Sequence, residues 1–247
     1  MLANRIRKHR VLTCIVVAGL LAIGAGCSVE PRTGDRWFRQ EQLFAQFNDN
    51  TRCLSMKNAY LLALATFLAN EETGRKAVLQ EWGFGRYQAF YYRKASIFGY
   101  VASNDRIVVV AFCGTDFLNP RDIVSDLPAR KMVQRAEYCS REGALMHNGF
   151  CKSLDVAWKE IHQKVQSQLG QNSNKSVWIT GHSRGGALAI LAALALAQDP
   201  TIGTMRIRGV YTFGQPRVGN IVFSEAAKEL PYFRIVNGGA LSRICHC

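Results

Sequence analysis

Residues 176–197, SVWITGHSRGGALAILAALALA, constrain the fold more than any other part of the sequence. The segment begins with an apolar run rich in β-branched residues, which is typical of a buried strand. It ends with a run of alanine and leucine, which is typical of a buried helix. Between the two runs, residues 181–185 match the pattern Gly-x-Ser-x-Gly, with Ser183 at its centre. The sequence therefore predicts a strand, a tight turn and a helix, with Ser183 at the turn.

The residues around Ser183 suit a catalytic nucleophile. A serine raised on such a turn has strained backbone angles, so its neighbours must lack a Cβ that would clash. Gly181 and Gly185 meet this need, and Gly186 lets the helix pack closely on the sheet. The first N–H groups of the helix favour negative charge that develops on a substrate oxygen. We therefore interpret Ser183 as a nucleophile; the alternative is an ordinary glycine-rich turn between a strand and a helix.

Length and composition are those of one globular domain. The chain has 247 residues, of which 48% are hydrophobic and 20% are charged, enough for one large α/β domain. It contains no Pro-rich or Gly/Ser-rich linker and no internal repeat. The net charge is +13, but no basic helix or RNA-binding aromatic motif accompanies it. We therefore expect a basic, solvated surface and no nucleic-acid partner; attraction to anionic lipid stays open.

Residues 1–27 have the layout of a targeting segment. Basic residues from Arg5 to Arg10 precede an uncharged, mostly apolar run, which is short for a membrane span and suits a signal peptide. Small residues then precede Cys27, an arrangement that resembles bacterial lipoproteins, whose cysteine is lipidated. We expect residues 28–247 to form the folded domain outside the cytoplasm, anchored to a membrane through a lipidated Cys27. Secretion without an anchor and an uncleaved anchor are the alternatives.

The cysteines beyond Cys27 have structural rather than metal-binding spacings. Cys139 and Cys151 are close in sequence and could form a disulfide in an oxidising compartment. Cys113 ends an apolar run, so we expect a buried free thiol there. No Cys-x-x-Cys pair or His/Cys spacing indicates a metal site. The sequence predicts no metal and no cofactor.

Apolar periodicity predicts the elements that precede the Ser183 turn. Helices are expected at residues 37–48, 55–71 and 76–82, and strands at 87–92, 97–102 and 106–112. Asn104 and Asp105 are expected to form the tight turn between the last two strands. The helices carry core-facing apolar stripes, and we assign them no function.

Several motifs, taken in chain order, resemble the class 3 lipase family. They are Phe-Cys-Gly-Thr at 112–115, Asp-Ile-Val-Ser-Asp-Leu at 122–127, Met-His-Asn-Gly-Phe at 146–150, the turn at 181–185, Tyr-Thr-Phe-Gly-Gln-Pro-Arg-Val-Gly at 211–219 and Arg-Ile-Val-Asn at 234–237. The resemblance covers about residues 58–237. It implies an α/β-hydrolase-like fold, with a mostly parallel central sheet flanked by helices and incomplete at the C-terminus. It also implies hydrolysis of carboxylic esters, typically acylglycerols.

The resemblance assigns roles to individual residues. Ser183 matches the nucleophile, and Thr115 matches the oxyanion-hole residue whose backbone N–H and side chain both donate. The backbone N–H of Arg184 completes the oxyanion hole. The family usually has leucine at this position, so Arg184 is expected to place a charge beside the site. Residues 116–129 match the lid, whose apolar side chains would turn towards lipid at an interface; the alternative is an ordinary surface helix.

The aspartate and histidine of the family's triad are not found. A serine nucleophile needs an imidazole to take its proton and an acid to orient that imidazole, and the family order is Ser, Asp, His. The aspartate is expected three residues after Asn237, where the sequence has Ala240. We therefore expect this polypeptide to hydrolyse esters poorly. The other candidates, none of which we assign as base or acid, are His9, His147, His162, His182, His246 and Asp199.

Two functions therefore stay open. In the first, the chain is a lipase-like hydrolase of lipid or small esters, which Ser183 and Thr115 favour. In the second, it is a catalytically impaired or inactive lipoprotein that keeps the fold and binds acyl chains, which the missing triad partners favour. We also hypothesise that a frameshift truncates the chain. A shifted reading of the codons for residues 240–247 can spell Ile-Val-Pro-x-Leu-Pro, which resembles the family's text after its aspartate.

Overall fold

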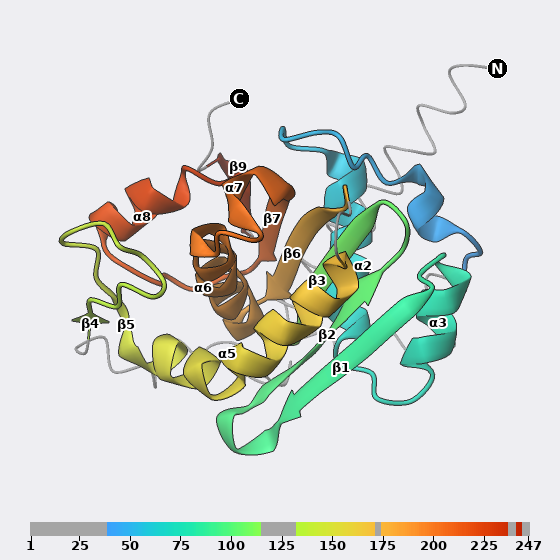
Figure 1. Cartoon of the computed structure of the whole chain (residues 1–247), viewed down its shortest axis with the longest axis horizontal. Coiled ribbons are helices and arrows are strands. Elements are labelled where there is room, and N and C mark those ends of the chain that lie inside the picture. Colours follow the sequence, from blue (N-terminus) through green and yellow to red (C-terminus); the bar gives the residue numbers. More distant parts are fainter. Residues whose placement is uncertain (1–38, 115–131, 171–173, 237–240, 244–247) are drawn as a thin grey trace.

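The structure is a computed structural model that describes residues 39–114, 132–170, 174–236 and 241–243. Its centre is a seven-stranded sheet with the order β1-β2-β3-β6-β7-β8-β9 (Figure 1). The strands of this sheet are β1 (Arg86–Tyr92), β2 (Ile97–Ser103), β3 (Ile107–Phe112), β6 (Ser176–His182), β7 (Ile207–Phe213), β8 (Tyr232–Ile235) and β9 (Leu241–Arg243). A small second sheet pairs β4 (Met132–Val133) with β5 (Met146–His147).

The middle of the large sheet is parallel. Strands β3, β6, β7 and β8 pair in one direction, whereas β1, β2 and β9 pair antiparallel towards the two edges. Parallel strands that are covered on both faces are near-continuous apolar runs, and every residue of β3 is buried. The mostly parallel sheet that the sequence predicts is therefore confirmed. Its parallel strands bring their carboxyl ends to one edge, where Ser183 follows β6.

Helices cover both faces of this sheet (Figure 1). Successive residues of a strand point to opposite faces. Accordingly, Val108 and Val110 belong to the apolar cluster that includes α5 (Asn148–Leu169) and α6 (Arg184–Gln198). Val109 belongs to the cluster on the other face, which includes α2 (Met56–Leu68). The shorter helices are η1 (Leu43–Gln46), α3 (Arg75–Glu81), η2 (Arg93–Ala95), α7 (Gly203–Arg206) and α8 (Ile221–Ala227).

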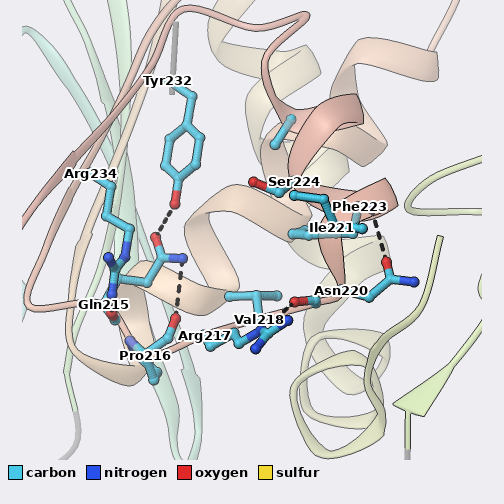
Figure 2. A pocket seen from close by; sticks show the side chains of 12 residues that line it. Gln215, Pro216, Arg217, Val218, Asn220, Ile221, Phe223, Ser224, Tyr232 and Arg234 are labelled. Carbon is cyan, nitrogen blue, oxygen red and sulfur yellow. Dashed lines mark hydrogen bonds between the residues drawn. The ribbon is translucent and has the colours of Figure 1, made fainter. Parts of the chain in front are cut away.

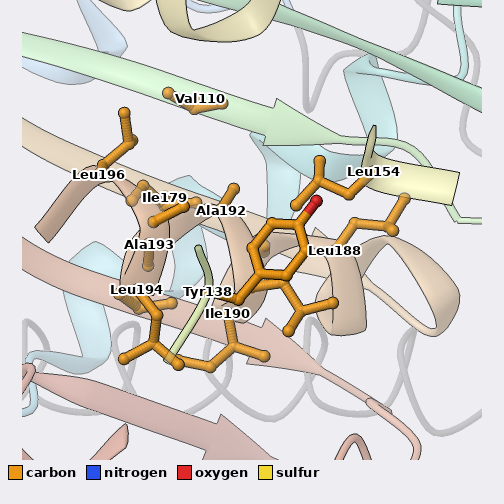
Figure 3. Close-up of a cluster of buried hydrophobic side chains, with 14 of the residues drawn as sticks. Val110, Tyr138, Leu154, Ile179, Leu188, Ile190, Ala192, Ala193, Leu194 and Leu196 are labelled. Atoms are coloured by element: carbon orange, nitrogen blue, oxygen red, sulfur yellow. The ribbon is translucent and has the colours of Figure 1, made fainter. Parts of the chain in front are cut away.

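Helix α6 is enclosed by the core. All of its residues from 185 to 196 are buried, which explains why its sequence is apolar on every side. Leu188 and Ile190 of α6 lie in one cluster with Leu154 of α5 and with Tyr138 (Figure 3). The alanines of α6 keep its diameter small, so the helix fits between the sheet and α5.

The expected elements are confirmed to within a few residues, with one exception. The helix expected at 37–48 is wrong in its described part, because only the short 3₁₀ helix η1 forms there. Gln42 has a left-handed backbone conformation (φ 53°), which a continuous α-helix does not allow. The aromatic residues still face the core: Phe44 stacks on Trp82 with 5.5 Å between ring centroids, and Phe47 meets Trp178 edge-on at 4.7 Å. Their spacing therefore reflects packing rather than helix periodicity.

The disulfide that Cys139 and Cys151 could form is not present. Both cysteines are free and buried, and they fill space in the apolar cluster around α5. Burial raises the pKa of the Cys151 thiol to about 11, so the thiol is protonated at neutral pH. Cys113 also carries a thiol outside any disulfide, as expected, but it is half-buried rather than buried. Its thiol contacts the side chain of Asn70 and the carbonyl of Gly114.

The turn expected between β2 and β3 is confirmed. Asn104 accepts hydrogen bonds from the backbone N–H groups of Arg106 and Ile107 through its side-chain oxygen. Within the described residues, no helix has both the length and the apolar character that a membrane crossing requires. The expected targeting segment, residues 1–27, lies outside the described residues.

Candidate active site

Ser183 lies on the turn between β6 and α6 in a strained conformation. Its backbone angles are φ 51° and ψ −123°, a region that residues with a side chain rarely occupy. The backbone holds it there: its N–H donates to the carbonyl of Phe213 on β7 at 2.8 Å, and its own carbonyl accepts from Gly186 at 3.0 Å. The turn is nearly closed to solvent, since Ser183 is only 7% exposed. The strand, tight turn and helix that the sequence predicts are therefore present.

Glycine is required on both sides of Ser183. A Cβ at Gly181 would lie 2.3 Å from the carbonyl oxygen of Gly185, and a Cβ at Gly185 would lie 2.3 Å from that of Cys113. Both distances are far below van der Waals contact. A Cβ at Gly186 would lie 3.1 Å from the Cβ of Gln215, which agrees with the expected close packing of α6. The segment after β3 thus touches the turn at Cys113.

Thr115, which is expected to donate in the oxyanion hole, comes two residues after Cys113. Gly114 lies next to His182, since a Cβ on Gly114 would lie 3.2 Å from Nδ1 of that ring. Thr115 comes next in the chain, but it lies outside the described residues, as does the expected lid at 116–129. The last described residue before Thr115, Gly114, therefore lies beside the Ser183 turn.

The side chain of Arg184 is bound to two neighbouring elements. Its guanidinium donates to the carbonyl of Ala95 at 2.6 Å, to the carbonyl of Ser96, and to the Ser153 hydroxyl at 2.7 Å. Ala95 and Ser96 lie between β1 and β2, and Ser153 lies on α5. Burial lowers the pKa of Arg184. The expected charge is thus tied to the β1–β2 connection and to α5, while Arg184 remains the first residue of α6.

His182 lies at the end of β6, on the α2 side of the sheet. Its ring is stacked towards Phe67 of α2, with 6.5 Å between the centroids. Burial lowers the pKa of His182 to about 4, because an apolar environment disfavours the charged imidazolium. The ring is therefore neutral at physiological pH.

His147 has a structural position at the start of α5. Its Nδ1 accepts a hydrogen bond from the backbone N–H of Gly149 at 3.1 Å, so the side chain caps the helix. Its ring packs against Phe150 with 5.0 Å between the centroids. Nε2 is buried and has no hydrogen-bond partner within the part of the chain that the structure describes.

His162 and Asp199 form a pair that the sequence did not predict. The ring of His162, on α5, contacts the carboxylate of Asp199, which caps the C-terminal end of α6. Burial alone would raise the pKa of Asp199, but hydrogen bonds from Thr201 and His162 outweigh it and the pKa is lowered. Ser183 precedes the other end of this helix of 15 residues, about 20 Å away at 1.5 Å per residue. The pair therefore cannot act on Ser183.

No acid or base among the described residues contacts the nucleophile candidate. The Ser183 hydroxyl has no hydrogen-bond partner in the described ranges, and His147, His162 and His182 each have the other contacts given above. His9, Ala240 and His246 lie outside those ranges. The described part of the site thus consists of a strained serine, the start of a buried helix and the end of β3.

The chain matches known lipases in both sequence and structure. A family model described as "Lipase (class 3)" matches residues 109–240. The chain is 31% identical over 144 residues to a lipase of Rhizopus niveus, covering 56% of this chain and 35% of that protein. It is 40% identical over 97 residues to a lipase of Caenorhabditis elegans, covering 38% of this chain and 27% of that protein. The chain thus spans about a third of the length of these curated relatives.

Solved structures extend the match to the fold. Lipase II from Rhizopus niveus has a TM-score of 0.61 at 24% identity, covering 74% of this chain and 73% of that one. The lipase from Rhizopus microsporus var. chinensis has a TM-score of 0.60 at 26% identity, covering 72% and 63%. The residues that the family model matches include most of β3, the Ser183 turn and β8. Because the family model covers more than half of its length, this chain belongs to the class 3 lipase family.

Proposed function

We propose that this chain carries the nucleophile and part of the oxyanion hole of a serine hydrolase that acts on lipid esters. The observation that carries the proposal is the strained Ser183, held between the carboxyl end of β6 and the amino end of α6. Strain of this kind costs about 1–3 kcal/mol and persists only where the surrounding structure enforces it. Here two tight glycine contacts and a hydrogen bond to Phe213 enforce it.

The proposed reaction is acyl transfer to Ser183. Its Oγ attacks the ester carbonyl carbon, the bond to the alcohol oxygen breaks, and the alcohol leaves with the proton that the serine hydroxyl gives up. Water then hydrolyses the acyl-serine, which releases the acid and returns a proton to Oγ. The negative charge on the carbonyl oxygen would be stabilised by the backbone N–H of Arg184 and by Thr115. The amino end of α6 adds a favourable electrostatic field at the same place. We assign no general base, since the described histidines have other positions.

Relatives support lipid esters as the substrate class. They include a triacylglycerol lipase of Nicotiana tabacum and a secreted mono- and diacylglycerol lipase of Gibberella zeae. We therefore propose acylglycerols as substrates and residues 28–247 as one lipase-like domain outside the cytoplasm. The secreted relative supports export. Anchoring through a lipidated Cys27 stays a prediction, which mass spectrometry of the mature protein would test.

Covalent labelling tests the nucleophile directly. The purified chain is treated with a fluorophosphonate and digested, and its hydrolysis of p-nitrophenyl butyrate is measured in parallel. We expect an adduct on Ser183, and any turnover of the parent chain should fall to background in Ser183→Ala. Ser167→Ala, an exposed serine on α5, is the control and should leave both readouts unchanged. Equal turnover in Ser183→Ala, or an unlabelled Ser183, would favour the non-catalytic acyl-binding protein instead.

A further inference from the structure

A cavity of about 310 Å³ is lined by residues that follow β7, including Gln215. It is bounded by the segment that follows β7, by α8 and by β8 (Figure 2). One of its lining residues, Gln215, packs on the first turn of α6, because a Cβ at Gly186 would lie 3.1 Å from the Gln215 Cβ. Gln215 therefore connects the cavity to the amino end of the helix that Ser183 precedes.

The cavity has an apolar wall and a polar wall. The apolar wall consists of Val218, Ile221, Phe223 and Ala227. Opposite it, Gln215, Tyr232 and Arg234 form the polar wall, and the Tyr232 hydroxyl donates to the Gln215 side chain at 2.7 Å (Figure 2). A cavity with this division suits a ligand that has a polar head and a short apolar chain.

The charge of the lining is entirely positive. It includes two arginines, Arg217 and Arg234, and no aspartate or glutamate. Neither arginine takes part in a salt bridge among the described residues. Arg234 donates to the carbonyl of Gln215 at 2.6 Å, and Arg217 donates to the carbonyl of Gly219 at 3.1 Å. A guanidinium has five N–H donors, so each of these bonds leaves donors for a further partner.

We propose that this cavity binds the oxyanion of a single-chain amphiphile, either a carboxylate or a phosphate. Guanidinium groups bind planar carboxylates and phosphates through paired hydrogen bonds, and Arg234 and Arg217 would supply them. Ile221 and Phe223 would contact the first carbons of the chain. The volume lies at the lower end of the range for small-ligand sites, so it holds the head and a few carbons only. That such a ligand is a product or substrate of this chain rests on the proposed function; its binding does not.

Calorimetric titration of the Ser183→Ala variant tests the proposal without turnover. The probes are octanoate, octyl phosphate and the uncharged methyl octanoate, each used as a monomer in solution. We expect saturable binding of octanoate, of octyl phosphate or of both, and binding of methyl octanoate that is at least about tenfold weaker. A preference for octanoate identifies a fatty-acid carboxylate as the ligand, and a preference for octyl phosphate identifies a phosphate head. Methyl octanoate binding as tightly as both anions, or no saturable binding of either anion, would overturn the proposal.

Arginine variants locate the binding. Arg217→Gln and Arg234→Gln, each in the Ser183→Ala background, should weaken anion binding by about tenfold. Arg208→Gln makes the same charge change on β7, away from the cavity lining, and should leave binding unchanged. Arg234 also bonds to Gln215, so its variant is checked by thermal unfolding; the exposed Arg217 carries the test if that variant unfolds. An equal loss in Arg208→Gln would show a nonspecific charge effect and refute the site. Labelling of Ser183 in the unmodified chain is measured separately, so failure of the cavity and failure of the nucleophile are distinguishable.

Discussion

The polar residues at the two ends of α6 are in opposite physical states. At the amino end, Ser183 has a left-handed φ of 51°, and its neighbour His182 is buried with a pKa lowered to about 4. At the carboxyl end, Asp199 has an extended backbone and holds both His162 and the backbone N–H of Thr201. One end stores strain, and the other end forms relaxed, satisfied contacts.

This difference shows that the residue types of a triad do not by themselves make an active site. Serine, histidine and aspartate all occur next to α6, yet the length of the helix keeps the acid–imidazole pair about 20 Å from the serine. The strained end is where a reactive group is held in place, whereas the relaxed end contributes to stability. Relieving the backbone strain of Ser183 should therefore raise stability, whereas removing the contacts of Asp199 should lower it.

The largest loss of stability is expected at the amino end of α6, where Gly185 is packed too closely to accept a side chain. Gly185→Ala places a Cβ 2.3 Å from the Cys113 carbonyl, so it should lower the free energy of unfolding by about 3 kcal/mol or more. Urea unfolding measures this loss. Gly85→Ala is the matched control, because a Cβ there meets nothing within 4 Å, and its effect should be small. Equal stabilities of the two variants would contradict the tight contact between β3 and α6.

The buried His182 should make stability depend on pH. Its folded pKa is about 4 and an unfolded histidine has a pKa of about 6.5. The unfolded state therefore binds the proton first. Stability is fully present above about pH 6.5 and is lost as the pH falls towards 4, by up to about 3 kcal/mol. Denaturant unfolding between pH 7 and 4 measures this loss. A His182→Gln variant that keeps the whole dependence would assign it to another group.

Arg184 should stabilise the amino end through its contacts with Ala95, Ser96 and Ser153. Arg184→Leu installs the residue that the family usually has but removes these hydrogen bonds. We expect the free energy of unfolding to fall by about 2 kcal/mol. Ser153→Ala should cost less, because the two carbonyl contacts remain. A leucine variant as stable as the parent chain would mean that these contacts contribute nothing net.

The smallest effects compare the two ends directly. Ser183→Gly should raise the free energy of unfolding by about 1 kcal/mol, because glycine adopts a positive φ without strain. Asp199→Gly should lower it by about 1 kcal/mol, because it removes the contacts to His162 and Thr201. Thermal and urea unfolding of the pair give both signs. Two changes of the same sign would remove the distinction between a strained and a relaxed end.

Local sequence patterns predicted the parts of the fold that depend on local physics. The apolar run of β3, the turn at Asn104 and the strand–turn–helix around Ser183 have periodicities or residue types that allow one local structure. The N-terminal helix was mispredicted because a spacing of aromatic residues is shared by a helix and by a loop that packs on Trp82 and Trp178. The spacing of the aromatic residues alone could not distinguish a helix from such a loop.

Contacts between segments that are distant in the chain could not be predicted from local sequence patterns. His162 and Asp199 belong to different helices, and nothing in either local pattern indicates that the helices meet there. The Arg184 contacts likewise depend on where the β1–β2 connection lies. The cavity needs α8 and β8 at a set distance from the segment after β7. The motif for Ser183 was visible in the sequence because glycine requirements are local, whereas the surroundings of the site depend on the completed core.

The enclosure of α6 has a consequence for the order in which the molecule opens. A helix that is buried on every side cannot exchange its amide hydrogens with solvent by fraying of a single face. The amides of α6 can become exposed to solvent only when β6 and β7, which the helix packs against, also unfold. The amides of residues 188–194 should therefore exchange only through global unfolding. Ser183 would then keep its strained geometry until the whole cooperative unit opens, so its reactivity towards a covalent probe would report on native-state population.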